Sequence, residues 1–212
     1  MMTMVRCACW SIFTMAGIVS VACGSVRYPA HYVLDFSAAS PTPPRSQALG
    51  PLLVRELDCP PYLCEGRVVY REEPHRIGFY DYHRWAVDPR AALTRLLSDR
   101  IGASSVFESV TVDGSPARAA YLLRGEIQRF EEVDDKTSIH AICTISASIV
   151  EVKTGTVRWK GSVSETVPVQ QRDVAGVVVA LGVASQTVAD RLVASIGNEM
   201  SERGAPDPRL HQ

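Results

Sequence analysis

The chain has 212 residues, of which 46% are hydrophobic and 21% are charged, and its net charge is −1. A chain of this length and composition can bury a substantial core, so we expect one globular domain. Proteins that bind nucleic acid need a basic surface, and the near-neutral charge argues against that class. We therefore expect no nucleic-acid partner.

The first 22 residues have the composition of a secretory signal peptide. Arg6 is their one charged residue, and residues 7–21 are apolar or small. This run is short for a membrane span, which takes about 20 apolar residues. We expect residues 1–22 to be removed from the mature chain.

The end of this segment resembles a bacterial lipobox, the sequence at which a cysteine is lipidated. Small residues precede Cys23, although Ser20 stands where a leucine is usual. The resemblance implies that Cys23 carries fatty-acid chains, palmitate among them, and anchors the protein to a membrane. Gly24 stands where an aspartate would retain a lipoprotein in the inner membrane, so the outer membrane is implied. The alternative is an ordinary signal peptide in which Cys23 has no role.

A short tether, residues 23–30, precedes a single domain that we expect to occupy residues 31–201. Residues 31–36 are the first predicted strand of this domain. Residues 37–51 contain four prolines and no apolar periodicity, which predicts an exposed loop. Residues 52–57 are the next predicted strand.

Cys59 and Cys64 flank a segment that contains two prolines. A metal site would need further ligands at suitable spacing, and the sequence supplies none, so no metal is expected. A redox-active pair is usually a CxxC sequence at a helix start, which the prolines oppose. In an oxidising compartment the spacing favours a local disulfide, and two free thiols are the alternative.

Residues 67–101 predict two strands, an aromatic cluster and a helix that pack as a unit. The strands are expected at residues 68–71 and 76–80, with a turn at Pro74 between them. Asp88 precedes Pro89, which is typical of a helix N-cap followed by proline at the first helical position. The aromatic cluster is Phe79, Tyr80, Tyr82 and Trp85, and the apolar helix face is Ala92, Leu93, Leu96, Leu97 and Ile101.

A strand is expected at residues 106–112, and three long strands follow it. Apolar or small residues alternate with polar ones over residues 121–127, 139–149 and 157–167. Alternation with a period of two is typical of an antiparallel meander with one buried face. Cys143 falls on that face and is expected to be a small core residue rather than a reactive thiol.

The last predicted element is a helix over residues 173–201, followed by a polar tail over residues 202–212. The first half of this helix, residues 174–184, is apolar on every side. One interpretation is that this half is buried within its own domain. The other is that it contacts a second copy or a partner, with Gly176 and Gly182 allowing close approach. The residues predicted for that contact are Val177, Val178, Val179 and Leu181.

Together these elements predict an α/β fold, a mixed sheet with an antiparallel meander and helices packed on it. The order of the parts in residues 67–101, after a lipoprotein-like start, resembles the ABC-type transport auxiliary lipoprotein family. The positions that carry the resemblance are Tyr70, Arg71, Tyr80, Tyr82, Arg84, Trp85, Leu96 and Leu97. The resemblance extends over about residues 32–200 and implies a fold like the N-terminal domain of TolB.

This resemblance implies a non-enzymatic, lipid-anchored periplasmic accessory of an ABC-type transport system of the mammalian-cell-entry class, which moves phospholipid between membranes. The implied partners are a mammalian-cell-entry-type periplasmic protein and an ABC permease and ATPase. A homo-oligomer is a further expectation, and no cofactor is implied. The alternative is an envelope structural or assembly lipoprotein that works without a transporter.

A secreted hydrolase is the third class considered. The sequence contains no GxSxG, HExxH or glycine-rich phosphate loop. His83, beside Asp81 and Arg84, gives the one suggestive cluster, and a solvated loop before the helix explains it better. We therefore predict no catalytic residue.

Overall fold

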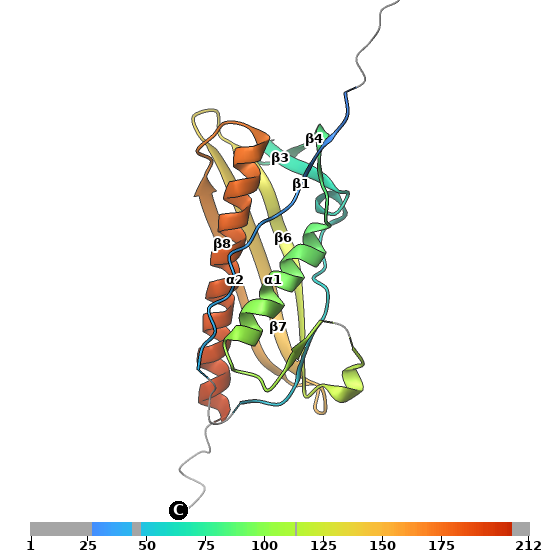
Figure 1. Ribbon diagram of the computed structural model, residues 1–212, viewed down its shortest axis with the longest axis vertical. Helices are drawn as coiled ribbons and strands as arrows, with labels where there is room; N and C mark the ends of the chain where they lie inside the picture. Colours follow the sequence, from blue (N-terminus) through green and yellow to red (C-terminus); the bar gives the residue numbers. More distant parts are fainter. Residues whose placement is uncertain (1–26, 44–47, 113, 205–212) are drawn as a thin grey trace, which may run out of the picture.

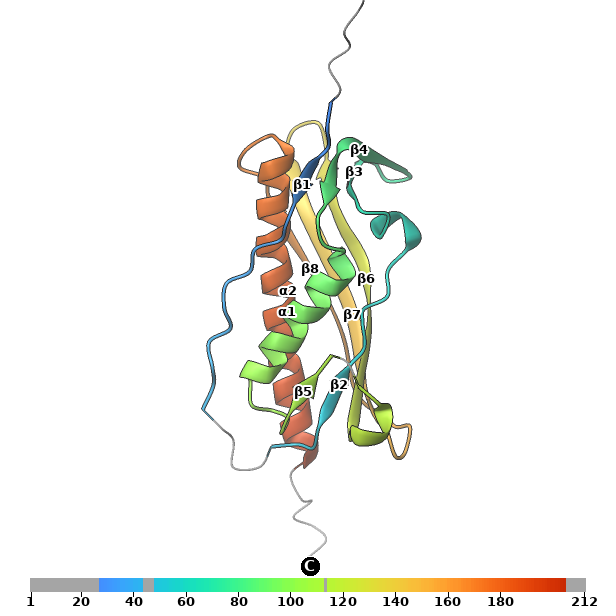
Figure 2. The same ribbon diagram turned by 45° about the vertical axis from the view of Figure 1, so that its right-hand side comes forward.

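The computed structural model describes residues 27–43, 48–112 and 114–204. In this part of the chain, eight strands form one curved mixed sheet, and both α-helices lie on the same face of it (Figures 1 and 2). The strands are β1 (Ala30–Tyr32), β2 (Leu52–Val54), β3 (Arg67–Glu73), β4 (Arg76–Trp85), β5 (Val110–Thr111), β6 (Tyr121–Asp134), β7 (Ile139–Glu151) and β8 (Val157–Pro168). The helices are α1 (Pro89–Ala103) and α2 (Val174–Gly204), with short 3-10 helices η1 (Pro61–Leu63) and η2 (Pro116–Arg118). The predicted α/β fold is confirmed, but the likeness to TolB is not.

The long strand β6 organises the sheet. Along one edge β6 pairs in parallel with β2 at its start (Leu52↔Tyr121) and with β3 near its end (Tyr70↔Glu132). Along the other edge it pairs with β7, which pairs with β8, and both of these pairings are antiparallel. The three strands of the expected meander are therefore confirmed, and the shorter N-terminal strands are added to its first strand.

A bulge in β6 changes which side chains face the helices. Ile127 pairs with Ile145 and Arg129 pairs with Thr144, so Gln128 is the extra residue. Before the bulge, odd-numbered residues of β6 pair with the inward-facing residues of β7. After it, even-numbered residues do so, beginning with Phe130.

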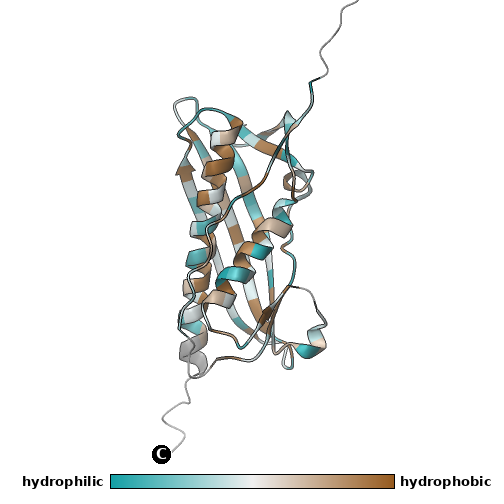
Figure 3. Ribbon diagram, in the orientation of Figure 1, coloured by the Kyte–Doolittle hydropathy of each residue, from teal (hydrophilic) through white to brown (hydrophobic). Residues whose placement is uncertain are grey.

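Hydrophobic and hydrophilic residues alternate along the long strands, as expected for strands with one buried face (Figure 3). The first half of α2 is hydrophobic. Trp159 of β8 is 1% exposed, and its indole Nε1 donates to Ser195 Oγ of α2 at 3.0 Å. Cys143 is fully buried on the inner face of β7, as expected. The core thus lies between the meander and α2.

Helix α1 begins as the sequence predicts. The Asp88 side chain accepts a hydrogen bond from the backbone N–H of Arg90 at 2.8 Å, and Pro89 stands at the first helical position. The apolar face of α1 is buried, with Leu93 and Ile101 both 0% exposed. Just before the helix, Trp85 is 8% exposed and the centroid of its ring lies 5.5 Å from that of Phe130.

Helix α2 is longer than expected, because it continues to Gly204 and includes the first residues of the predicted tail. The Asp173 carboxylate accepts a hydrogen bond from the backbone N–H of Gly176 at 2.7 Å and so caps its start. By length and composition alone, Val174–Met200 could cross a membrane, yet 56% of its most apolar stretch is buried inside the domain. Such burial is typical of a core helix.

The first predicted strand is shorter than residues 31–36. β1 pairs in parallel with β4, and its last residue, Tyr32, lies opposite Trp85, where β4 ends. Residues after Tyr32 therefore have no strand to pair with. They continue instead as a crossover segment, residues 33–43, which runs across α2 and beside α1 (Figures 1 and 2).

Candidate functional site

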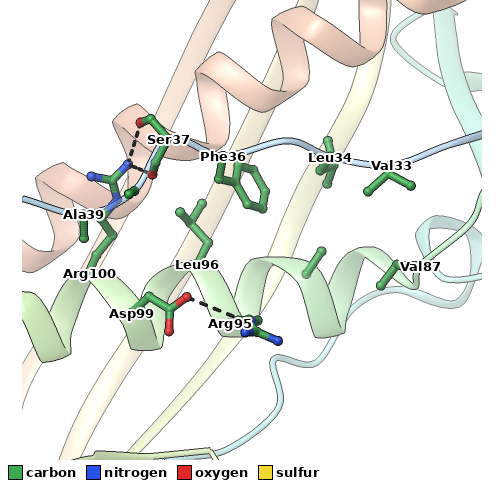
Figure 4. A pocket seen from close by; sticks show the side chains of 12 residues that line it. Val33, Leu34, Phe36, Ser37, Ala39, Val87, Arg95, Leu96, Asp99 and Arg100 are labelled. Atoms are coloured by element: carbon green, nitrogen blue, oxygen red, sulfur yellow. Dashed lines mark hydrogen bonds and ion pairs between the residues drawn. The ribbon is translucent and has the colours of Figure 1, made fainter.

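A groove with a volume of about 380 Å³ lies between the first part of the crossover segment and α1 (Figure 4). Two large apolar side chains at this groove stand partly in solvent, Val33 at 61% and Val87 at 47% exposure. The apolar lining consists of Val33, Leu34, Phe36, Ala38, Ala39, Val87, Ala92 and Leu96. Exposed apolar side chains gathered in a concave place are typical of a contact site.

The polar end of the groove is held by Arg100 of α1. Its Nη2 donates to the carbonyl oxygen of Ser37 at 3.1 Å and to Gln186 Oε1 of α2 at 3.3 Å. Its Nε lies 3.4 Å from the carboxylate of Asp190. The backbone N–H of Ser37 donates to the same Gln186 oxygen at 2.9 Å. One guanidinium therefore joins the crossover segment to both helices.

A second ion pair at the groove is of a different kind. Arg95 Nε lies 3.8 Å from the Asp99 carboxylate, and the two side chains are 83% and 65% exposed. An ion pair so well solvated contributes little to stability. Arg95 and Asp99 are therefore free to meet charges on a ligand or partner.

Three of the four residues predicted for contact through α2 are buried in the domain itself. Val177 is 2%, Val178 is 8% and Leu181 is 0% exposed, whereas Val179 is 68% exposed. The first half of α2 is therefore mostly buried within its own domain, which is the first of the two interpretations, and Val179 is the one of these four residues that stays exposed. The sheet covers one side of the helix, and the crossover segment lies against another.

The two glycines in the first half of α2 allow close approach, but the approaching backbone belongs to the same chain. A Cβ atom on Gly176 would stand 2.1 Å from the carbonyl oxygen of Gln171. A Cβ atom on Gly182 would stand 3.6 Å from the carbonyl oxygen of Asp35, which is ordinary contact. The large apolar residues left exposed on this half of α2 are Val179 and Val183, at 68% and 46% exposure and one turn apart.

The cysteines behave as small structural residues in the described part of the chain. The sulfur atoms of Cys59 and Cys64 are placed in contact, and the Cα atoms are 6.5 Å apart, within the range that a disulfide spans. Burial raises the pKa of the Cys143 thiol to about 12, so this thiol is not a nucleophile at neutral pH. Cys23 lies outside the described residues.

His83 does not lie in a loop, because β4 continues through it to Trp85. The Tyr32 hydroxyl and His83 Nδ1 are 2.9 Å apart, and the two rings stack with centroids 5.7 Å apart. Among the described residues, no group of three or more His, Cys, Asp or Glu side chains could hold a metal ion.

Val33, Val87 and Val183 were not predicted to be exposed apolar residues. Residue 33 was expected within a strand, because the sequence does not show which strand lies beside it. The signal that was available is the pair Asp88 and Pro89. Because α1 begins there, β4 has to end before it, and β1, which pairs with β4, has to end at the same level.

Fold and groove together define a class, a two-layer α/β domain with a largely apolar groove on its helical side. Comparison with family models is more specific. Residues 32–193 match the model described as ABC-type transport auxiliary lipoprotein component. This match covers more than half of the chain, which therefore belongs to that family.

Solved structures with the same fold include the protein XCC0632 from Xanthomonas campestris. It is 19% identical, with a TM-score of 0.72 over 82% of this chain and 98% of that one. An uncharacterized protein is 14% identical, with a TM-score of 0.63 over 80% of this chain and 99% of that one. At such identities the likeness shows the fold alone. Comparison with the curated proteins gives no match.

Proposed function

We propose that the protein is a non-enzymatic, lipid-anchored accessory of an ABC-type transport system of the mammalian-cell-entry class, which passes phospholipid between membranes. The observation that carries this proposal is the family match over residues 32–193, a span that includes β2 to β8, α1 and most of α2. The proposed location is the periplasmic face of the outer membrane. Cys23, with its attached fatty-acid chains, is the proposed anchor.

The groove beside α1 is the proposed docking surface. Its occupant is an apolar segment of a mammalian-cell-entry-type periplasmic protein, which in turn works with an ABC permease and ATPase. Val33 and Val87 support this assignment, because their exposed surface is apolar and lies at the groove. Arg95 and Asp99 supply charges at the same place.

Self-association is a separate part of the proposal and is now confined to Val179 and Val183. The buried residues Val177, Val178 and Leu181 support the fold of the subunit and take no part in this contact. A ring of subunits would suit a component that receives or surrounds a transport conduit.

Affinity purification from detergent-solubilised envelope tests the docking proposal. The wild-type chain should retain the mammalian-cell-entry-type protein, and Val87→Asp should lose it while keeping the wild-type melting temperature. Val157→Asp is the matched control, because Val157 is 51% exposed but lies at the start of β8, away from the groove. Equal retention by all three proteins would overturn the groove as the docking surface.

Cell fractionation tests the anchor. Cys23→Ser removes the residue that carries the fatty-acid chains, and stable membrane anchoring depends on such chains. This variant should therefore be exported but should no longer sediment with membranes. Continued membrane association of this variant would overturn the role of Cys23.

A further inference from the structure

A second concave site lies on the strands β3, β4 and β6, where the described chain begins. It is a pocket of about 450 Å³ between Arg27 and the strands β3, β4 and β6. Figure 1 shows this end of the molecule, where β1 runs beside the β3–β4 hairpin. This pocket is separate from the groove beside α1, and the two share no lining residue.

Aromatic rings form much of the wall of this pocket. The Tyr70 and Tyr80 rings are tilted against each other with centroids 5.0 Å apart, and Tyr80 meets His83 edge-on at 5.6 Å. The Tyr70 ring lies across Gly78, where a Cβ atom would stand 2.2 Å from its Cζ. Only glycine at position 78 therefore leaves room for this ring. Phe79 and Tyr82 complete the aromatic lining.

Two of these rings already hold cations of the same chain. The guanidinium carbon of Arg27 lies 4.7 Å from the centroid of the Tyr82 ring. That of Arg67 lies 4.0 Å from the centroid of the Phe79 ring. Both distances are within the range of favourable cation–π contact, so the aromatic surface here attracts positive charge.

Carboxylates supply the rest of the lining. Glu72, Asp81, Glu132 and Asp134 border the pocket, and Glu72 is paired with Arg76. Glu132 is 4% exposed, and its Oε2 accepts a hydrogen bond from the Tyr80 hydroxyl at 2.8 Å. Its other carboxylate oxygen has no hydrogen-bond partner among the residues that the structure describes. This oxygen is not a buried atom without a partner, so it is open to solvent in the pocket, where a ligand can donate a hydrogen bond to it.

From this arrangement we infer that the pocket binds a primary ammonium group, with the tyrosine rings around the cation and Glu132 as its hydrogen-bond acceptor. A primary ammonium carries three N–H donors, which match the open oxygen of Glu132 and the carboxylate of Asp134. A quaternary ammonium could use the rings but has no donor for these oxygens. The aromatic walls give no ligands for a metal ion.

The place of the pocket points to a source for this group. Arg27 is four residues from Cys23, and an extended chain of four residues spans at most about 14 Å. The pocket is therefore held near the headgroups of any membrane that Cys23 enters. An aminophospholipid headgroup such as ethanolamine is then the nearest primary ammonium. The membrane source rests on the proposed anchor, whereas binding of the ammonium group does not.

Titration of the purified full chain in detergent with free ethanolamine, followed by tyrosine fluorescence or ligand-observed NMR, tests the site. Ethanolamine should bind, and N-acetylethanolamine, which lacks the charge, should not. Glu132→Gln keeps the size of the side chain and an acceptor for Tyr80 but removes the charge, so affinity should fall about tenfold or more. Tyr82→Leu should also weaken binding, and Tyr80→Phe, which keeps the ring, should not.

Glu126→Gln is the matched control, since Glu126 is an exposed carboxylate on the same strand and lies outside the pocket. Wild-type affinity in Glu132→Gln, or binding of N-acetylethanolamine as tight as that of ethanolamine, would overturn the site. Wild-type protein in vesicles then tests the source. Free ethanolamine should bind more weakly in vesicles that contain phosphatidylethanolamine than in vesicles of phosphatidylglycerol alone. Equal affinities would overturn the membrane source and leave a free amine as the ligand.

Discussion

Arg100 of α1 and Ser37 of the crossover segment are joined by two hydrogen bonds from one nitrogen. Nη2 of Arg100 donates to the carbonyl oxygen of Ser37 at 3.1 Å and to its hydroxyl oxygen at 3.2 Å. The Arg100 side chain is 13% exposed and also pairs with Asp190 of α2. Since the crossover segment has no strand beside it, these contacts fix its position on the helices and give the groove its second wall.

Replacing Arg100 with glutamine should therefore loosen the crossover segment. We expect the free energy of unfolding to fall by about 1–3 kcal/mol, because several charge-assisted hydrogen bonds are lost in a mostly buried place. Urea denaturation measures this change, and hydrogen exchange should accelerate within residues 33–43. Arg95→Gln, on the same helix but 83% exposed, should change stability by less than about 0.5 kcal/mol. Equal effects of the two substitutions would remove the assigned role from Arg100.

Trp85 should be a major contributor to stability. Its side chain is 8% exposed and contacts Phe130 between β4 and the core. We expect Trp85→Ala to lower the free energy of unfolding by about 3–5 kcal/mol, the usual cost of deleting a large aromatic side chain from a core. Tyr82→Ala, at 42% exposure, should cost far less. An unchanged melting transition in Trp85→Ala would show that the indole is dispensable for packing.

The cysteine assignments predict a simple peptide map. Without reductant, Cys59 and Cys64 should be found linked within one tryptic peptide, because no Lys or Arg lies between them. Cys143 should be free but should react with iodoacetamide only after denaturation, since burial raises the pKa of its thiol. Detection of Cys143 in a disulfide would contradict its inner-face position in β7.

Neighbouring valines on α2 separate packing from association. Val178 is 8% exposed and Val179 is 68% exposed, so the same change to glutamate should have opposite results. Val178→Glu buries an unpaired charge and should destabilise the domain by about 3 kcal/mol or more. Val179→Glu should leave the melting temperature unchanged and shift sedimentation toward the monomer. A Val179→Glu protein that associates as the wild type does would contradict contact through this face.

The free energy of unfolding should depend on pH through Glu132, and the direction of the pKa shift gives the sign of this dependence. Burial raises the pKa of its carboxyl above the ordinary value of 4.5, and the hydrogen bond from Tyr80 opposes that shift. The folded state then binds more protons than the unfolded state above pH 4.5. The contribution of Glu132 to the free energy of unfolding therefore falls as pH rises through this window.

Glutamine at position 132 carries no such charge. The melting temperature of Glu132→Gln relative to wild type should accordingly rise between pH about 4.5 and about 7. Calorimetry at several pH values measures this difference. Glu126→Gln, which removes an exposed carboxylate from the same strand, is the control. A difference for Glu132→Gln that shrinks with pH would mean that the shift has the opposite sign.

Local chemistry made much of the fold predictable. Asp88 and Pro89 mark the start of α1 because capping depends on a few adjacent residues. Alternation over residues 139–149 fixes the inner face of β7, including Cys143, because successive side chains of a strand point to opposite faces. Properties of this kind need no knowledge of what the chain packs against.

Features that depend on distant partners were not predictable. Gln128 forms a bulge because of how β6 meets β7, and the bulge puts Phe130 and Glu132 on the inner face. Burial of Val178 depends on the sheet and the crossover segment around α2, which composition does not reveal. For the same reason the pocket around Glu132 could not be found, because its walls come from three strands and the tether.

The parallel pairing of β2 and β3 with β6 bears on the order in which the strands of this domain can come together. Both Leu52 of β2 and Tyr70 of β3 find their partners more than 60 residues later, at Tyr121 and Glu132. A chain made from its N-terminus has to wait for those partners with the apolar side chains of β2 and β3 in water, whereas β6, β7, β8 and α2 follow one another directly. Local contacts close sooner than distant ones. We therefore expect the C-terminal half to form first and the β2 and β3 strands to be added to it, so a nascent chain released before β6 is complete would lack the strand that joins the two halves of the sheet.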